Sequence, residues 1–291
     1  TGNFNTVMGW NAMDGATGLA DDNVAIGNGA MGGAIGAEVV DDCVAIGSGA
    51  LAGALDSTDG TDESSRTIAI GASALAALTT GEKNLAIGYQ AMAANTTGGN
   101  NTIIGYQAAA SANHASFDGN VGVGNLVFDG VADNIAVTQN TAIGYGSMSG
   151  TMTAAATNNT ALGFKSGEAL TTGANNTLIG SGAGDGLTQT NTAVAVGLND
   201  LGAATTQAHN CVAVGNSALS GSWSTAAAEG VVAIGGNAIA GVLTADAVNS
   251  IGVGYNALNA LTEGLRNVAV GAYALDTCTT SDYNTAVGTS A

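Results

Sequence analysis

The sequence has no proline, few charged residues and few aromatic residues. Among its 291 residues, 9% are charged, 4% are aromatic and 46 are glycine. The missing proline and the lack of a strict Gly-X-Y period exclude a collagen-like chain. A hydrophobic fraction of 46% is too high for an intrinsically disordered chain. The composition therefore indicates an ordered protein, but not an ordinary globular domain.

Basic residues are scarcer still. Four Lys and Arg stand against 22 Asp and Glu, which gives a formal net charge of −18. No basic stripe is available to neutralise phosphate groups, so nucleic acid is not expected as a partner. The acidic excess predicts a solvated, self-repelling surface rather than a specific cationic partner.

Long apolar runs and targeting signals are also missing. The most apolar window, 231–248, contains two glycines, Asn237 and Asp246, so no membrane-spanning helix is predicted. The chain lacks an initiator Met and the apolar region of a signal peptide, so we expect a processed terminus or a piece of something longer. Three cysteines cannot all pair within one chain, which argues against a disulfide scaffold.

What the sequence does contain is one short motif, repeated throughout. A glycine that follows a run of aliphatic residues recurs sixteen times, at spacings of 17 to 24 residues. This period predicts a parallel β-solenoid, an all-β fold in which each coil stacks on the last. The glycines, numbered position 0 of the motif, are expected to form sharp corners. They are Gly9, Gly27, Gly47, Gly71, Gly88, Gly105, Gly124, Gly144, Gly163, Gly180, Gly197, Gly215, Gly235, Gly254, Gly271 and Gly288.

The positions before the glycine predict how each coil is built. Position −1 is always Ile, Val, Leu or Met, and it shares a strand face with position −3, so we expect both to line the interior. Position −4 is Asn in ten copies, which predicts a ladder of side-chain amides bonded from coil to coil. The predicted ladder comprises Asn5, Asn23, Asn84, Asn101, Asn120, Asn140, Asn159, Asn176, Asn267 and Asn284.

Position −2 is Ala in eleven copies and, on this alternation, faces outward. An outward column of alanine suits close packing against a partner chain, which predicts a homo-oligomer. The alternative is that the alternation is reversed and alanine fills a narrow core. The candidate packing column includes Ala25, Ala45, Ala69, Ala86, Ala142 and Ala161.

The half of each coil that follows the glycine is less regular. Leu75 and Leu78 lie three residues apart before Gly81, which fits either a short helical turn with a glycine cap or a second short strand. We expect a second strand, because segments this short do not form stable helices alone.

The spacings between glycines recur every five coils. They divide the chain into super-repeats of about 1–96, 97–188 and 189–279, followed by a partial coil at 280–291. Duplication of a five-coil unit explains this pattern, with periodic bulges that match a periodic partner as the alternative. We expect residues 1–291 to form one solenoid without terminal caps, on the order of 75 Å long, whose open strand edges allow copies to stack head to tail.

The core Asn-Val-Ala-Ile-Gly-x-x-Ala is read at 23–30 and nearly so at 267–274. It resembles the head repeat of trimeric autotransporter adhesins of the YadA type and similar repeats of bacteriophage tail fibres. The resemblance extends over the whole chain. It implies a left-handed parallel β-roll with three chains side by side, an extracellular location on a cell or virion surface, and a host-surface or matrix receptor.

Few residues are candidates for metal binding. Asp56, Asp59 and Asp62 lie in the longest spacer, at a spacing that could hold Ca²⁺. They do not match an EF-hand, so a solvated loop is the preferred interpretation and no metal or other cofactor is predicted. The pairs Asp21-Asp22 and Asp41-Asp42 precede successive strands and are expected to stack, which favours a cation there only slightly.

The remaining reactive residues predict no site. His114 and His209 have no Cys or Glu at ligand spacing, so surface positions are expected. Cys43 and Cys211 occupy position −4 nine coils apart, too far to pair, and are expected to be small buried thiols. Corner aromatics such as Tyr89 could stack on glycans, although packing at the corner is the commoner role.

No catalytic constellation emerges, so no enzyme is predicted. The sequence favours a non-enzymatic extracellular structural fibre of adhesin-head or tail-fibre type that presents a repetitive surface for attachment. A homopolymeric filament or sheath subunit, assembled head to tail, is the alternative. An ice- or mineral-binding surface is weaker, because Thr occupies position −3 in only six copies and is expected to point inward.

Overall fold

The computed structural model describes residues 3–16, 20–35, 40–55, 65–113, 117–132, 135–153, 156–202, 207–221, 227–243 and 247–291. In these ranges the chain consists of strands and turns and contains no helix. The fold is a parallel β-solenoid, as the repeat predicts. The described ranges accordingly hold no helix long and apolar enough to cross a membrane.

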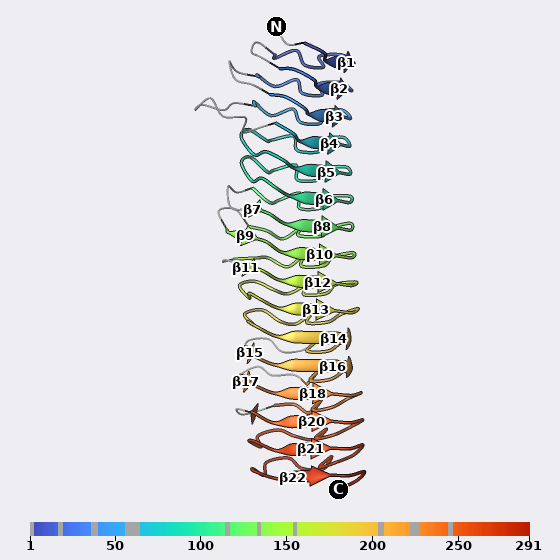
Figure 1. The fold of residues 1–291 in the computed structure, drawn as a ribbon, viewed down its shortest axis with the longest axis vertical. Coiled ribbons are helices and arrows are strands. Elements are labelled where there is room, and N and C mark those ends of the chain that lie inside the picture. Colours follow the sequence, from blue (N-terminus) through green and yellow to red (C-terminus); the bar gives the residue numbers. More distant parts are fainter. Residues whose placement is uncertain are drawn as a thin grey trace. The chain divides into compact units, whose positions relative to one another are not determined.

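The chain divides into two compact units, residues 1–146 with 151–154 and residues 147–150 with 155–291. Each unit contains eight main strands, one before each of its corner glycines. Figure 1 shows these strands as a series of arrows, one to a coil. In unit 1 they are β1 (Thr6–Met8), β2 (Val24–Ile26), β3 (Val44–Ile46), β4 (Ile68–Ile70), β5 (Leu85–Ile87), β6 (Thr102–Ile104), β8 (Val121–Val123) and β10 (Thr141–Ile143). In unit 2 they are β12 (Thr160–Leu162), β13 (Thr177–Ile179), β14 (Val194–Leu198), β16 (Val212–Asn216), β18 (Val232–Ile234), β20 (Ile251–Val253), β21 (Val268–Val270) and β22 (Thr285–Val287).

Within each unit neighbouring strands pair in parallel and in the order of the chain, so equivalent motif positions lie opposite one another. In unit 1, Ala25 lies opposite Ala45. In unit 2, Ala195 lies opposite Ala213, and the longer strands β14 and β16 also pair their corner glycines. Backbone N–H and C=O groups are thus used between coils, which explains why proline is absent from the chain.

In the described parts of the spacers, six further short strands precede position −4. In unit 1, β7 (Phe117–Asp118) pairs with β9 (Val137–Thr138). In unit 2, β17 (Ala227–Glu229) pairs with β15 (Gln207–His209) and β19 (Ala247–Val248), and β11 (Ala156–Thr157) occupies the equivalent place after β10. These strands form further small sheets, and they occur in coils that are longer than 17 residues.

The expected inside and outside of the main strands are reversed. Alanine at position −2 is fully buried, as at Ala25, Ala45, Ala69, Ala86, Ala142 and Ala161. Positions −3 and −1 are partly exposed on the opposite face, and strands β2 to β6 all share this pattern. The prediction that alanine faces outward as a packing column was therefore wrong, and its alternative, a narrow alanine core, is correct.

The reason lies in the residues that return across the coil. In most coils position +4 carries a large apolar side chain that is fully buried, such as Met31, Leu51 or Leu75. Because this side chain fills the interior, the strand can contribute only a small one. At Gly122 even a Cβ atom would come within 3.1 Å of the Phe128 ring, since phenylalanine replaces the usual Leu or Met at +4.

The segment that follows each glycine is neither strand nor helix, so the expectation of a second strand there was wrong. It consists of two successive turns, closed by bonds from the Ala74 N–H to the Gly71 carbonyl and from the Leu78 N–H to the Leu75 carbonyl, both 3.2 Å. Positions +2 and +4 adopt left-handed backbone, as at Ser73 (φ 56°) and Leu75 (φ 50°). The Leu75 N–H also donates to a carbonyl of the next coil at 3.0 Å, so stacking stabilises a backbone that local propensity disfavours.

Candidate functional surface and polar pocket

The asparagines at position −4 form hydrogen-bonded columns inside each unit. Asn120 shows the pattern: its Oδ1 accepts the backbone N–H of Asn140 at 3.0 Å and the Asn140 side-chain amide at 3.2 Å. Its own Nδ2 donates to the Val137 carbonyl at 2.7 Å and to Oδ1 of Asn101 at 3.2 Å. The same contacts join Asn84 with Asn101, Asn159 with Asn176 and Asn267 with Asn284, and the backbone contact joins Asn5 with Asn23. The ladder is thus an internal support of the coils rather than a surface for ligands.

Where position −4 is not Asn, smaller side chains take part in the column. Thr67 Oγ1 accepts the Asn84 N–H at 3.4 Å, and the Asn23 Oδ1 accepts the Cys43 N–H at 2.9 Å. Cys43 and Cys211 are fully buried, and burial raises the pKa of each thiol to about 11. Both thiols therefore stay protonated and unreactive at neutral pH.

All sixteen corner glycines have positive φ, between 127° and 156°. A Cβ atom at Gly88 would lie 2.1 Å from the carbonyl oxygen of Gly105 on the next coil. These positions therefore require glycine for two reasons, the backbone conformation and the approach of the neighbouring coil. Their role is structural.

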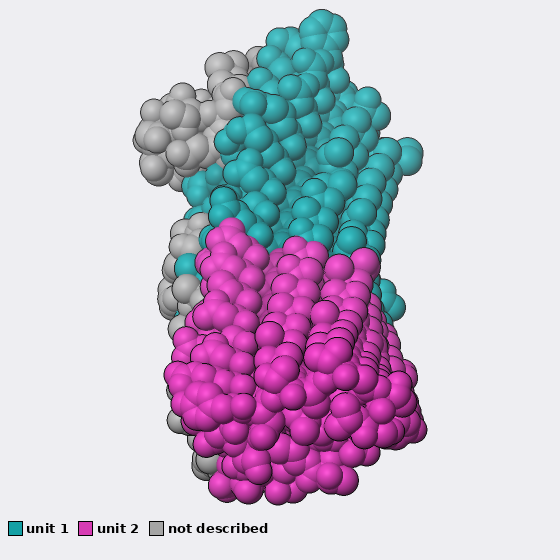
Figure 2. Space-filling model, turned by 60° about the horizontal axis from the view of Figure 1, so that its bottom comes forward, with its two compact units in different colours: residues 1–146, 151–154 teal, residues 147–150, 155–291 magenta. Residues whose placement is uncertain are grey.

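The outward face of the main strands is apolar. It carries positions −3 and −1, with exposed members that include Ile143 (36%) in unit 1 and Leu162 (44%) in unit 2. Position +1 follows beyond the corner glycine and is often aromatic and exposed, as at Tyr89 and Tyr106, whose rings stack 5.4 Å apart. We call positions −3, −1 and +1 together the strand face. Side chains of successive coils form rows along each unit (Figure 2).

The strand face carries no charge. At positions −3, −1 and +1 of all sixteen copies there is no Asp, Glu, Lys or Arg, although the chain has a net charge of −18. The carboxylates lie in the turns and spacers instead. An uncharged apolar face on a strongly acidic chain is typical of a surface that packs against another molecule.

A second polar column lies at position −6, and the sequence predicts only its aspartate pair. Its side chains accept the backbone N–H of position −6 on the preceding coil. Asp41 accepts from the Asp21 N–H at 2.8 Å, which is the stacking expected of these two aspartates, and Ser65 accepts from Asp41 at 3.1 Å. In unit 2, His209 Nδ1 accepts from the Asn191 N–H at 3.2 Å. The recurrence of oxygen-bearing side chains two residues before the asparagine was the signal in the sequence.

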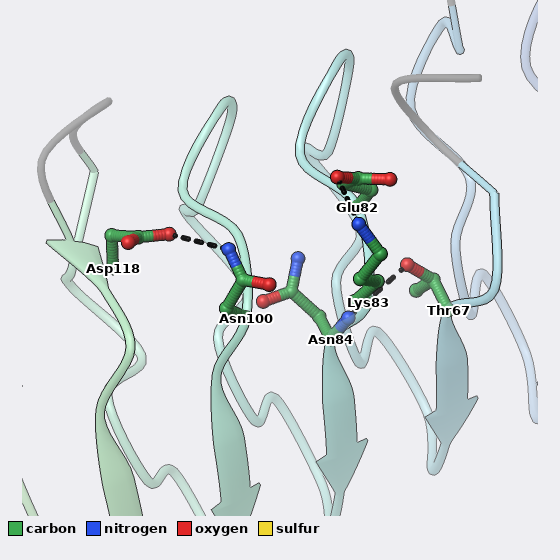
Figure 3. Close-up of polar contacts among 6 residues, drawn as sticks. All are labelled: Thr67, Glu82, Lys83, Asn84, Asn100 and Asp118. Atoms are coloured by element: carbon green, nitrogen blue, oxygen red, sulfur yellow. Dashed lines mark hydrogen bonds and ion pairs between the residues drawn. The ribbon is translucent and has the colours of Figure 1, made fainter.

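A shallow polar pocket lies beside this column in unit 1. Asn100 donates from Nδ2 to Oδ1 of Asp118 at 3.1 Å, and the ammonium group of Lys83 pairs with the carboxylate of its neighbour Glu82 (Figure 3). The pocket is lined by Thr80, Gly81, Glu82, Thr97, Gly99, Asn100 and Asp118. These residues come from consecutive coils, so the pocket exists only because the coils stack.

The described residues offer little for metal chemistry. They contain no cluster of three His, Cys, Asp or Glu side chains able to hold a metal ion. The calcium candidates Asp56, Asp59 and Asp62 lie outside the described residues, as does His114. Asp185 lies next to Glu168, and burial together with this neighbouring charge raises the pKa of the Asp185 carboxyl.

Asp200 is a buried carboxylate at position +3, where most coils have alanine. Its two oxygens accept the backbone N–H groups of Gly215 and Ala218, each at 2.7 Å. Burial raises the pKa of this carboxyl, and the two hydrogen bonds oppose the rise. Asp200 thus stabilises the corner of the next coil through these two hydrogen bonds, and its carboxylate is not available to a ligand.

Comparisons of the chain with protein-family models, with curated proteins and with solved structures find no match. The fold defines the class of the protein as a parallel β-solenoid repeat protein, and its two candidate functional features are the strand face and the polar pocket.

Proposed function

We propose that the protein is a non-enzymatic structural fibre of the adhesin-head or tail-fibre kind, located outside the cell or on a cell or virion surface. It works as a homo-oligomer, a trimer by the resemblance of its repeat, and presents a repetitive surface to a host-surface or matrix receptor. The observation that carries the proposal is the uncharged strand face, with partly exposed aliphatic residues on every coil. Such a face is costly in water and favourable in a contact between chains.

The charge distribution supports contact between copies of this chain. Two acidic chains repel each other, but they can meet at the strand face without bringing carboxylates together. Aliphatic side chains at position −1 and tyrosines at +1, such as Tyr89 and Tyr106, have the composition of an interface core. The strand face thus takes the role first expected of the alanine column.

The test is the oligomeric state in solution, measured by light scattering and sedimentation over a range of concentrations. Ile104→Lys places a charge on the strand face of unit 1, and we expect it to weaken association by about tenfold or more. Gln139→Lys is the matched control. It adds the same charge at an exposed position −5, where lysine already occurs as Lys83 with the same left-handed backbone. A monomeric wild type, or equal effects of the two variants, would contradict the proposal.

The head-to-tail filament is distinguished by particle length. Electron microscopy at low and high protein concentration should show particles of constant length for a closed oligomer. Particles that lengthen with concentration would support the filament subunit instead.

A second candidate function, an ice- or mineral-binding surface, is supported by the direction of the threonines at position −3. Thr at position −3 was expected to point inward, but Thr102 and Thr141 in unit 1 and Thr160 and Thr177 in unit 2 lie on the exposed strand face. Regularly spaced outward hydroxyls among aliphatic groups suit a surface that orders water or contacts ice or a mineral. Thermal hysteresis of a protein solution measures this property, and its absence would rule out the ice-binding function.

A further inference from the structure

In the position −6 column, side chains accept a backbone N–H of the preceding coil. The polar pocket of unit 1 lies where one of these side chains is missing. The equivalent position recurs every five coils, at Gly99, Asn191 and Asp282. In unit 2, Asn191 accepts the backbone N–H of Ala174 at 2.7 Å, and Asp282 accepts that of Leu265 at 2.7 Å. Gly99 has no side chain to do the same for the equivalent N–H, that of Glu82.

The Glu82 N–H is consequently left without an acceptor. None of the hydrogen bonds of the described residues uses it. A Cβ atom built on Gly99 would lie 3.5 Å from the Glu82 nitrogen and 3.5 Å from Oδ1 of Asp118. The space of the absent side chain therefore opens between a free backbone donor and a carboxylate. An oxygen atom of a ligand in this space would replace the missing acceptor.

The groups around this space both donate and accept hydrogen bonds. The Glu82 N–H and the Asn100 amide nitrogen donate, whereas the carboxylates of Glu82 and Asp118 accept. Thr80 and Thr97 add hydroxyl groups that can do either. The depression has a volume of about 280 Å³, close to the lower end of pockets that hold small molecules, roughly 300 Å³.

The charges select against ionic ligands. An anion would meet the carboxylates of Glu82 and Asp118, and the ammonium group of Lys83 is already paired with Glu82. A metal cation would meet the Glu82 N–H and the amide nitrogen of Asn100, which is directed at Asp118. A neutral ligand with several hydroxyl groups satisfies both kinds of neighbour, because each hydroxyl donates one hydrogen bond and accepts others.

We propose that this pocket, centred on Gly99, binds a neutral sugar ring, with a ring hydroxyl accepting from the Glu82 N–H and others donating to Asp118 and Glu82. This inference rests on the attachment function proposed above and adds the ligand class to it. It assigns the coil of Gly99 a property that the equivalent coils of Asn191 and Asp282 lack, because these two residues fill the same space with their own side chains.

Ligand-observed NMR of the full chain with a panel of neutral hexoses, N-acetylhexosamines and their disaccharides tests the proposal. We expect saturable binding of at least one member to the wild type. Gly99→Asn should reduce it by about tenfold or more, because the new side chain takes the Glu82 N–H as Asn191 takes that of Ala174. The new Cβ would lie 3.1 Å from the Glu82 carbonyl oxygen, so the fold needs only a small shift to accept it.

A matched pair of variants separates the pocket from general effects. Asn100→Ala removes a lining side chain and should weaken binding, whereas Asn175→Ala makes the same change at an exposed position −5 outside the pocket and should leave it intact. Unfolding curves for each variant establish that it is folded. No binding by any panel member, or binding that Gly99→Asn leaves unchanged, would overturn the proposal. So would saturable binding of Ca²⁺, or of the acidic sugar sialic acid, that the same variant abolishes.

The oligomeric state of the same samples keeps the two proposals apart. If the wild type is an oligomer but no sugar binds, the pocket is wrong and the fibre stands. If sugar binds to a chain that stays monomeric, the fibre fails and the pocket stands.

Discussion

The side-chain amide of Asn101 donates a 3.1 Å hydrogen bond to Oδ1 of Asn84, and the backbone N–H of Asn101 donates to the same oxygen at 3.1 Å. One side chain thus satisfies both the main chain and the side chain of the next coil. Because the same arrangement repeats along the column, each interior asparagine supports two neighbours. The solenoid is therefore held together by buried amides as well as by apolar packing.

Removing one interior member of the ladder should be costly. Asn120→Ala leaves the Asn140 N–H and the Val137 carbonyl without partners in a buried site. We expect the free energy of unfolding to fall by about 2–4 kcal/mol, measured by urea denaturation. Asn125→Ala truncates an exposed asparagine on the same coil and removes only its solvent-exposed hydrogen bond from the Tyr106 N–H, so it should cost less than about 1 kcal/mol. Similar losses for the two variants would show that the ladder contributes little.

A corner glycine should tolerate no side chain. In Gly88→Ala the new Cβ would lie 2.1 Å from the Gly105 carbonyl oxygen at a φ of 137°, so the coils must separate or the corner must rearrange. We expect a loss of roughly 4 kcal/mol or more, or failure to fold. Gly49→Ala is the control, because its Cβ would have only Ser73 Oγ nearby, at 3.9 Å, and left-handed backbone alone costs about 1 kcal/mol.

The three cysteines should differ in reactivity. Cys43 and Cys211 are buried with thiol pKa values raised to about 11, whereas Cys278 is partly exposed. A thiol-reactive chromogenic disulfide at pH 8 should label one cysteine in the folded protein and three in denaturant. Because the folded pKa values exceed the ordinary value of 9.0, the stability that the two protonated thiols contribute should be lost as pH rises from 9 through about 11. Rapid labelling of three thiols under native conditions would contradict this prediction.

Asp200 should make stability depend on pH in the acidic range. Folding raises the pKa of this carboxyl, so its protonated form is favoured in the folded state. Its contribution is fully present below the ordinary pKa of 3.8 and is lost as pH rises through the raised value. As the pH rises through this range, the unfolding free energy of the wild type should therefore fall relative to that of Asp200→Ala. A difference that does not change with pH would contradict the assignment.

Several features could be predicted because they are local. The glycine after each aliphatic run identifies the corner, and its positive φ follows from its lack of a Cβ atom. Asn at a fixed position in ten copies predicts its ladder, because only stacked coils bring such residues together. Which face of each main strand is buried could not be predicted in the same way. In Val24-Ala25-Ile26 both faces of the strand are apolar, so alternation alone cannot say which one is buried.

The sequence by itself determined the solenoid, its corners and its asparagine columns, because a repeated motif stacks against copies of itself in only one register. Tertiary structure decided which side of the strand is the core. Buried Leu51 and its equivalents return across the coil and leave room only for alanine, which turns the aliphatic residues outward as the strand face. It also decided that the space left by Gly99 lies between the Glu82 N–H and Asp118, a juxtaposition of three coils that no single copy of the motif contains.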